Sequence, residues 1–251
     1  MKRRVYRAST MLALFTAVAA LTIILTDNSL RHLIALAFST WPTAARLIAA
    51  GVGGYLLGSI PFGFIIIGVL RERDIRDAGS GRTGGTNAMR AGGFGAGALT
   101  VIGDLLKAYG GVTFARIVFP GNLWAEVFAG WGVLLGHNAS IYLAFRGGAG
   151  TAPNMGVAAA YWLPSLIFTL PWFPIGMFVI RIASLTSLII GGVIPLIFAV
   201  RALLGHGPWE YVVYGIGAWF LVAYALRPNI KRLIDGTESL VDLQTQSTDR
   251  S

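Results

Sequence analysis

The sequence contains no cysteine and few charged residues, and each shortage narrows the functions that the protein can have. Without cysteine there is no disulfide and no thiolate metal site. Charged residues make up 12% of the chain, about half the roughly 25% of an ordinary soluble domain. The three histidines (His32, His137 and His206) lie in separate segments, so no metal-binding cluster is visible. We therefore expect no metal ion and no cofactor.

Apolar residues dominate instead, at 55% of the 251 residues with a mean hydropathy of +0.68. A membrane-spanning helix needs about 20 apolar residues, so spans would occupy most of the chain. The apolar segments lie at 11–25, 43–70, 94–119, 124–145, 154–169, 172–180, 188–204 and 211–226. No small-residue cleavage site follows the first, so it is interpreted as an uncleaved span. The prediction is an all-α polytopic membrane bundle of seven core transmembrane helices plus one extra N-terminal helix.

The net charge of +9 has an explanation that needs no nucleic acid. Cytoplasmic loops of membrane proteins carry an excess of Lys and Arg. With the N-terminus inside and the spans alternating, only Arg31, Arg46, Arg116 and Arg201 fall outside. We therefore expect both termini, the polar Gly-rich loops and the segment around Arg181 to lie in the cytoplasm, with no nucleic-acid partner.

The first polar segment, 79–90, reads GSGRTGGTNAMR. Its glycines allow tight turns that present backbone amides to an anion, as in phosphate-binding nests. Ser80, Thr86 and Asn87 add neutral donors, and Arg82 and Arg90 add positive charge. The segment is not a Walker A loop, since it does not end in Gly-Lys-Ser/Thr. A flexible loop with incidental basic residues fits the composition equally well.

Asp104 and Lys107 are ionisable groups inside an apolar segment, which are costly and therefore functional or paired. Three residues apart, they share one helix face, so an ion pair that orders the bundle is the alternative to a site. His137 precedes a second Gly-rich loop, 146–150, which opens onto a helix whose N-terminus favours anions. On its own, His137 is better interpreted as a packing residue.

Two basic segments complete the polar set. Residues 181–187 form a short polar connection, and 227–232 form a basic patch next to the last span. Taken alone, such a patch anchors a protein to lipid headgroups.

Together these motifs resemble the bacterial acyl-phosphate-dependent glycerol-3-phosphate acyltransferase family (PlsY type), over about residues 49–238. They are, in order, Gly58-Ser59-Ile60-Pro61-Phe62-Gly63, Asp74-Ile75-Arg76, GSGRTGGTNAMR, Gly103-Asp104…Lys107, Gly136-His137, Phe145-Arg146-Gly147-Gly148, Arg181…Ser184-Leu185…Ser187, and Asn229-Ile230-Lys231-Arg232-Leu233…Gly236-Thr237-Glu238. Each motif is modest alone, but their shared order in a chain of this hydropathy is specific.

The resemblance implies a seven-helix domain over 49–238 in the bacterial inner membrane, with its active site at the cytoplasmic face. It implies transfer of a fatty acyl group from acyl phosphate to the 1-hydroxyl of sn-glycerol 3-phosphate, giving lysophosphatidic acid and phosphate for phospholipid synthesis. Expected partners are these substrates, membrane lipids and the enzyme that forms acyl phosphate. Residues 1–48 would be an extension with the extra span, and 239–251 a disordered cytoplasmic tail.

The resemblance also implies roles by position. The expected catalytic residues are Ser80, Arg90, Lys107 and Asn229. The expected substrate- and phosphate-binding residues are Gly79, Gly81, Thr86, Asn87, Arg146, Gly147, Gly148, Gly150, Arg181 and Ser184. The expected supporting residues are Ser59, Asp104 and His137. In this hypothesis Arg90 and loop amides hold phosphate, while Ser80, Lys107 and Asn229 position the glycerol hydroxyl.

The chain departs from the family pattern at three positions. Ala149 stands where a cation is usual, Leu226 where a histidine is usual, and Pro153 where a hydroxyl residue is usual. Each charge-assisted hydrogen bond lost costs about 1.5–3 kcal/mol, and Arg146 is the expected substitute for the missing cation. The departures leave open a non-catalytic membrane scaffold or lipid-binding protein. A small-anion transporter is the weaker alternative, because no internal repeat is found.

Overall fold

The computed structural model describes residues 27–241, and every regular element within them is helical. The expected first span, 11–25, lies outside the described residues. The first half contains α2 (Asn28–Phe38), α3 (Thr43–Gly58), α4 (Phe62–Arg71), the short 3₁₀ turn η1 (Ile75–Asp77), α5 (Gly85–Gly92), α6 (Phe94–Val118) and α7 (Leu123–Asn138). The second half contains η2 (Ile141–Leu143), α8 (Thr151–Tyr161), α9 (Ser165–Thr169), α10 (Trp172–Pro174), the π-helical turn η3 (Ile175–Ile180), α11 (Ala183–Leu203), α12 (Glu210–Ala225) and α13 (Arg227–Ile234). The all-α fold class is thus confirmed.

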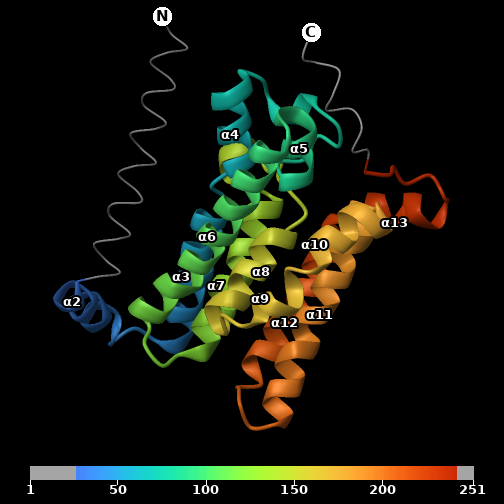
Figure 1. The fold of residues 1–251 in the computed structure, drawn as a ribbon. Coiled ribbons are helices and arrows are strands. Elements are labelled where there is room, and N and C mark those ends of the chain that lie inside the picture. The colour runs from blue at the N-terminus through green and yellow to red at the C-terminus, as the bar shows by residue number, and fades with distance from the viewer. Residues whose placement is uncertain (1–26, 242–251) are drawn as a thin grey trace, which may run out of the picture.

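The long apolar helices run roughly side by side as a bundle (Figure 1). Among the described residues, Thr43–Arg71, which joins α3 to α4, and Ala183–Leu203 are long and apolar enough to cross a membrane. The α3–α4 stretch breaks at 59–61, where Pro61 precedes α4 and lacks the N–H that an unbroken helix would use.

Glycines bring α3 and α7 into backbone contact. A Cβ added to Gly54 would lie 2.2 Å from the carbonyl oxygen of Ala129, and one added to Gly132 would lie 2.1 Å from that of Gly51. Close approach through small residues is typical of membrane helices, which pack without a hydrophobic driving force between them. The rest of the core lies among α6, α7, α8, α11 and α12, around the fully buried side chain of Tyr214.

One expected span is broken into shorter helices. The segment expected at 154–169 is divided into α8 and α9, and α8 has 11 residues, a rise of about 16 Å at 1.5 Å per residue. That is roughly half of a 30 Å hydrocarbon core. Helix α8 ends at Trp162, whose backbone is extended, and Pro164 and Pro171 sit at the starts of the next two helical pieces. The chain therefore turns inside an apolar stretch.

The polar segment after the last span is also more ordered than expected. Its first part forms α13, which leaves the end of α12 (Figure 1). Residues 239–241, from the expected disordered tail, return to the start of α11. There the amide of Val241 donates to the carbonyl oxygen of Arg181 at 2.7 Å, and the Val241 side chain is buried.

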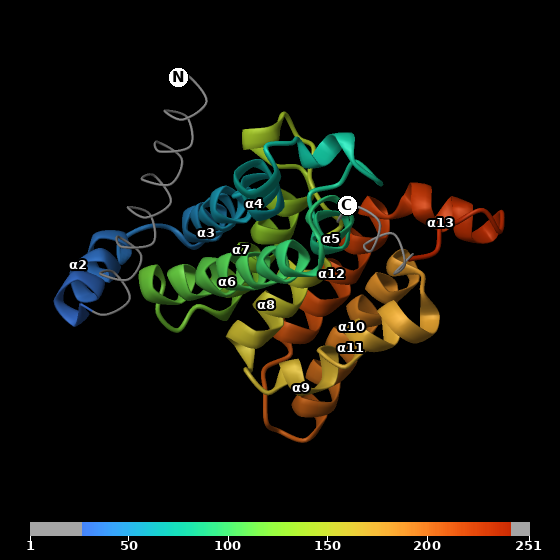
Figure 2. The same cartoon turned by 45° about the horizontal axis from the view of Figure 1, so that its top comes forward.

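Helices α4, α5 and α13 all lie at one end of the bundle, and a second view shows α5 facing α12 and α13 (Figures 1 and 2). The polar loops predicted to share one side of the membrane therefore do meet at one end of the molecule.

Candidate active site

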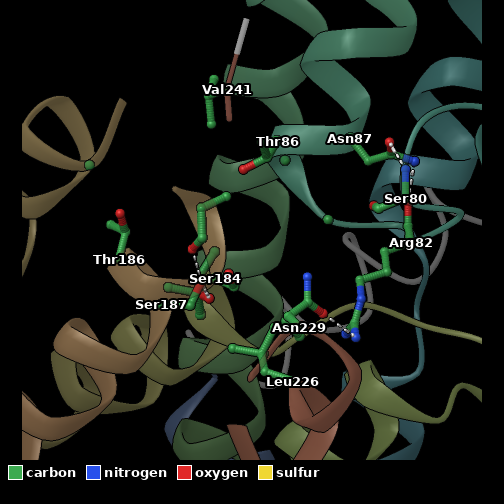
Figure 3. A pocket seen from close by; sticks show the side chains of 18 of the residues that line it. Ser80, Arg82, Thr86, Asn87, Ser184, Thr186, Ser187, Leu226, Asn229 and Val241 are labelled. Atoms are coloured by element: carbon green, nitrogen blue, oxygen red, sulfur yellow. Dashed lines mark hydrogen bonds between the residues drawn. The ribbon is translucent and has the colours of Figure 1, made fainter. Parts of the chain in front are cut away.

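A cavity of about 920 Å³ opens where these loops meet. Its walls are the loop and helix at 79–90, the start of α8, the start of α11 and the segment from Leu226 to Val241. In Figure 3, Thr86 and Ser184 face each other from opposite walls, and Arg82 reaches toward Asn229. Residues from the polar segments 79–90, 146–150, 181–187 and 227–232 thus share one cavity, and Asp104 also lines it.

Asn87 fixes the shape of the first loop. Its buried amide nitrogen donates to the carbonyl oxygens of Ile75, Ala78 and Arg82 at 2.8–3.0 Å, and its amide oxygen accepts from the backbone N–H of Ser80 at 3.1 Å. These bonds commit its amide group to the shape of the loop. Asn87 lines the cavity, and its expected contact with substrate stays a prediction.

Gly79 and Gly81 turn the same loop through left-handed backbone conformations, with φ of 50° and 68°. A Cβ on Gly79 would also lie 2.4 Å from the amide oxygen of Asn87. The glycines and Asn87 together carry Ser80 to the cavity, where its side chain is exposed.

Unused donors remain on this wall. Arg90 is exposed, lines the cavity and forms no ion pair within residues 27–241. Gly85 and Thr86 begin α5 at the cavity, and the first amides of a helix have no acceptor within it. The site therefore offers a guanidinium, a hydroxyl and backbone amides to an anion, as predicted for Arg90, Ser80 and Thr86.

Glu238 organises the opposite wall, although it received no role in the sequence analysis. Its carboxylate accepts from the Ser184 hydroxyl at 2.9 Å, the Asn229 amide at 2.7 Å and the Arg232 guanidinium at 2.7 Å. Burial alone would raise the pKa of this carboxyl, but the three donors outweigh burial and lower it. The available signal was its place in the Gly236-Thr237-Glu238 part of the last motif that carries the family resemblance.

Lys107 lies behind the cavity wall. Its ammonium is 2.8 Å from the Asp104 carboxylate, donates to the Ile60 carbonyl oxygen at 2.7 Å, and contacts Nδ1 of His137 at 3.1 Å. An ammonium has three donors and no acceptor, so all three are committed, and Nδ1 is the accepting nitrogen. Lys107 does not line the cavity. Its expected contact with the glycerol hydroxyl stays a prediction, and its contacts are those of a residue that positions Asp104 and His137, which do line the cavity.

The glycines of the second loop serve close packing. A Cβ on Gly148 would lie 2.0 Å from Nε2 of His137, and one on Gly147 would lie 2.0 Å from the His137 carbonyl oxygen. The Gly148 amide already donates to that oxygen at 3.0 Å. Of the three predicted glycines only Gly150 lines the cavity, so the phosphate-binding role given to the other two is not supported.

Three further expected residues lie outside the cavity lining. Arg146 is exposed on the loop, and its expected substitution for the missing cation stays a prediction. Arg181 fastens the C-terminal segment through its backbone bond to Val241. Ser59 is buried at the break after α3, where its carbonyl oxygen accepts from the Ser140 hydroxyl at 2.6 Å.

Arg82, whose charge the sequence analysis counted without assigning it a role, reaches across the cavity. Its guanidinium donates to the carbonyl oxygen of Ala225 at 2.7 Å, to the amide oxygen of Asn229 at 3.1 Å and to the carbonyl oxygen of Gly148 at 3.4 Å. It therefore joins the first loop, the second loop and the α12–α13 junction.

Comparison with known proteins identifies the family. A model of the glycerol-3-phosphate acyltransferase family matches residues 48–236. The chain belongs to this family. The acyltransferase of Thermosynechococcus vestitus is 35% identical over 206 residues, which cover 78% of this chain and 95% of the relative. That of Nitrobacter winogradskyi is 36% identical over 190 residues, covering 75% and 92%.

Solved acyltransferase structures share the fold. The chain is similar to PlsY, an integral membrane glycerol 3-phosphate acyltransferase, in its glycerol 3-phosphate form, with 31% identity and a TM-score of 0.67. That match covers 78% of this chain and 96% of PlsY. The lysophosphatidic acid form gives 29% identity and a TM-score of 0.65, covering 77% and 94%. The expected family and the helical membrane fold are confirmed.

The cavity of this acyltransferase contains all three departures from the family pattern. Ala149, Pro153 and Leu226 line it, and none of their side chains supplies a hydrogen-bond donor or an acceptor.

Proposed function

We propose that the protein transfers an acyl group from acyl phosphate to the 1-hydroxyl of sn-glycerol 3-phosphate, releasing lysophosphatidic acid and inorganic phosphate. One observation carries the proposal beyond family membership. At one end of a membrane bundle, a single cavity gathers exposed Ser80 and Arg90 with the first amides of α5. These are the groups that hold a phosphate close to a reacting hydroxyl.

The reaction requires no covalent bond between the protein and a substrate. The glycerol 1-hydroxyl oxygen attacks the acyl carbonyl carbon, the bond from that carbon to the phosphate oxygen breaks, and the hydroxyl proton leaves with the released phosphate. Acyl phosphate is already activated, so no acyl-enzyme is needed. The rate then depends on holding both phosphates and aligning the hydroxyl, which positioning and fixed charges supply.

The roles follow from the contacts. Arg90 and the α5 amides bind phosphate, and Ser80 donates to a substrate oxygen from the loop that Asn87 holds. Asn229 and Ser184, both bound to Glu238, form the opposite wall. The apolar residues Phe173, Met177 and Ile190 line the same cavity and provide the environment that an acyl chain prefers.

The orientation is part of the proposal. The cavity end carries the loops rich in Lys and Arg, so the positive-inside tendency places it in the cytoplasm of a bacterium, at the inner membrane. Soluble glycerol 3-phosphate reaches the cavity from that side. The enzyme that forms acyl phosphate is the expected upstream partner.

An acyl-transfer assay on the purified, lipid-reconstituted protein tests the proposal. Labelled glycerol 3-phosphate is supplied with acyl phosphate, and in parallel with acyl-CoA and acyl carrier protein thioesters. We expect lysophosphatidic acid from acyl phosphate alone. No product from any donor, in a well-folded sample, would instead favour a non-catalytic lipid-binding protein.

Matched variants test the assigned roles. Arg90→Gln removes a charge-assisted hydrogen bond worth about 1.5–3 kcal/mol, and is expected to lower kcat/KM about ten- to hundredfold. Arg73→Gln removes the same charge from an exposed position outside the cavity and is expected to behave as the parent. An Arg90→Gln protein with parental kinetics would exclude the phosphate-binding role.

A further inference from the structure

Arg82 places a positive charge in the cavity without a carboxylate beside it. The ion pairs formed within residues 27–241 do not include Arg82. Its three protein partners are the neutral oxygens of Gly148, Ala225 and Asn229. By contrast, Arg232 in the same lining is paired with Glu238 at 2.7 Å. The Arg82 charge is therefore held in place but not neutralised.

The surroundings of Arg82 favour an anion. Its side chain is half-buried, and burial together with the nearby charge of Arg232 lowers the pKa of the guanidinium, against a smaller opposing effect of Glu238. An arginine nevertheless stays protonated in proteins. A desolvated cation that already feels a second cation is stabilised when an anion enters beside it. The five N–H donors of the guanidinium make three bonds to the protein, so two remain for a ligand.

The position of this guanidinium coincides with two of the departures from the family pattern. Gly148 and Ala225, whose carbonyl oxygens it binds, directly precede Ala149 and Leu226. Both of these apolar residues line the cavity with Arg82, and Figure 3 shows the Arg82 side chain ending near Asn229 and Leu226. Two of the three departures from the family pattern therefore lie next to residues that one arginine from a different loop contacts.

The geometry points to Arg82 as a substrate-binding residue that holds a phosphate group in this cavity and supplies the positive charge that position 149 lacks. The ligand class is a phosphate monoester or acyl phosphate dianion, whose oxygens accept charge-assisted hydrogen bonds from a guanidinium. The inference rests on the proposed acyl transfer and adds to it a second phosphate-binding cation besides Arg90.

The test compares Arg82→Gln, Arg82→Lys and the double variant Arg82→Gln/Ala149→Lys with the parent, and with Arg73→Gln as the charge-matched control. KM for acyl phosphate and for glycerol 3-phosphate, and the inhibition constant of inorganic phosphate, are measured on reconstituted protein. Losing the charge-assisted bonds is expected to raise one KM and the phosphate inhibition constant about ten- to hundredfold. The KM that changes identifies which substrate phosphate Arg82 holds.

Restoring a positive charge at another position separates the effect of the Arg82 charge from that of its hydrogen bonds to the protein. If Arg82 binds phosphate, a lysine at 149 restores much of the lost affinity in the double variant, and Arg82→Lys lies between Arg82→Gln and the parent. If Arg82→Gln does not fold, Arg82→Lys carries the comparison with the parent. The inference would be overturned if KM and the phosphate inhibition constant were unchanged in Arg82→Gln. It would also be overturned if the loss of affinity only paralleled a lower melting temperature and was not reversed by the lysine at position 149. An inactive parent would instead overturn the proposed acyl transfer.

Discussion

Replacing Lys107 by methionine distinguishes a positioning lysine from a catalytic one. The substitution keeps the length of the side chain but leaves the Asp104 carboxylate, 1% exposed, without the ammonium that lies 2.8 Å away. Breaking a buried ion pair by removing one partner typically costs about 3–5 kcal/mol, because the remaining charge is stranded. At roughly 2–4 °C per kcal/mol for a chain of this size, the melting temperature should fall by about 6–20 °C.

The double variant Asp104→Asn/Lys107→Met removes the stranded charge as well. Replacing a whole buried pair by neutral groups is often nearly neutral, so we expect most of the lost stability to return. Because the Lys107 ammonium is committed to Asp104, Ile60 and His137, the double variant should also retain much of the parental kcat. Its KM for glycerol 3-phosphate should stay close to that of the parent.

The measurements are thermal unfolding in detergent and acyl transfer at a temperature where every variant is folded. A stable double variant whose kcat has fallen by about 10²–10⁴, the usual contribution of a proton-transferring group, would refute the positioning role. It would show that the Lys107 ammonium takes part in the chemistry. A variant that stays unstable would show that the Ile60 and His137 contacts, and not the ion pair, hold this region.

Three other substitutions test the remaining contacts. Gly148→Ala forces a Cβ to within 2.0 Å of an imidazole nitrogen and should cost about 1–3 kcal/mol of stability in thermal unfolding, whereas Gly68→Ala, with nothing within 4 Å, should be harmless. Glu238→Gln should raise KM for glycerol 3-phosphate. In the parent, the contribution of the carboxylate to substrate binding is complete above its ordinary pKa of 4.5 and is lost as pH falls through its lowered pKa. The KM of the variant should therefore lack that dependence on acid pH. Arg116→Met leaves buried Glu126 without its 2.6 Å partner and should lower the melting temperature while leaving KM unchanged, and adding Glu126→Gln should restore stability.

The sequence predicted the features that depend on composition and local spacing. Charge asymmetry between loops was enough to place the polar segments on one side, and the structure brings residues from these segments into one cavity. A spacing of three residues on a helix was enough to pair Asp104 with Lys107. The break at Pro171, between 154–169 and 172–180, was predicted. The division of the fourth core span near Pro164 was not, because the apolar character of the sequence continues across it.

The roles of individual side chains depended on contacts that the sequence does not reveal. Asn87 was expected to bind substrate, but its partners are backbone carbonyls whose convergence requires the folded loop. Arg82 contacts the carbonyl oxygen of Ala225, which is 143 residues away in the sequence. The Lys107 ammonium contacts His137, near the end of α7. A motif identifies which residues gather, whereas hydrogen bonds decide which of them remain available to a substrate.

The distribution of charge pairs separates the residues that hold the fold from those that bind. Inside the bundle Lys107 is balanced by Asp104, and Arg116 is balanced by Glu126, as expected where unpaired charge is costly. At the cavity, by contrast, positive charges are not matched by negative ones, because Arg82 and Arg90 line it without an ion pair among residues 27–241. Two cations facing one space repel each other, so the fold keeps a charge excess that an entering phosphate relieves. The repulsion between the two cations is removed when a phosphate binds between them, which favours substrate binding in the cavity of the proposed reaction.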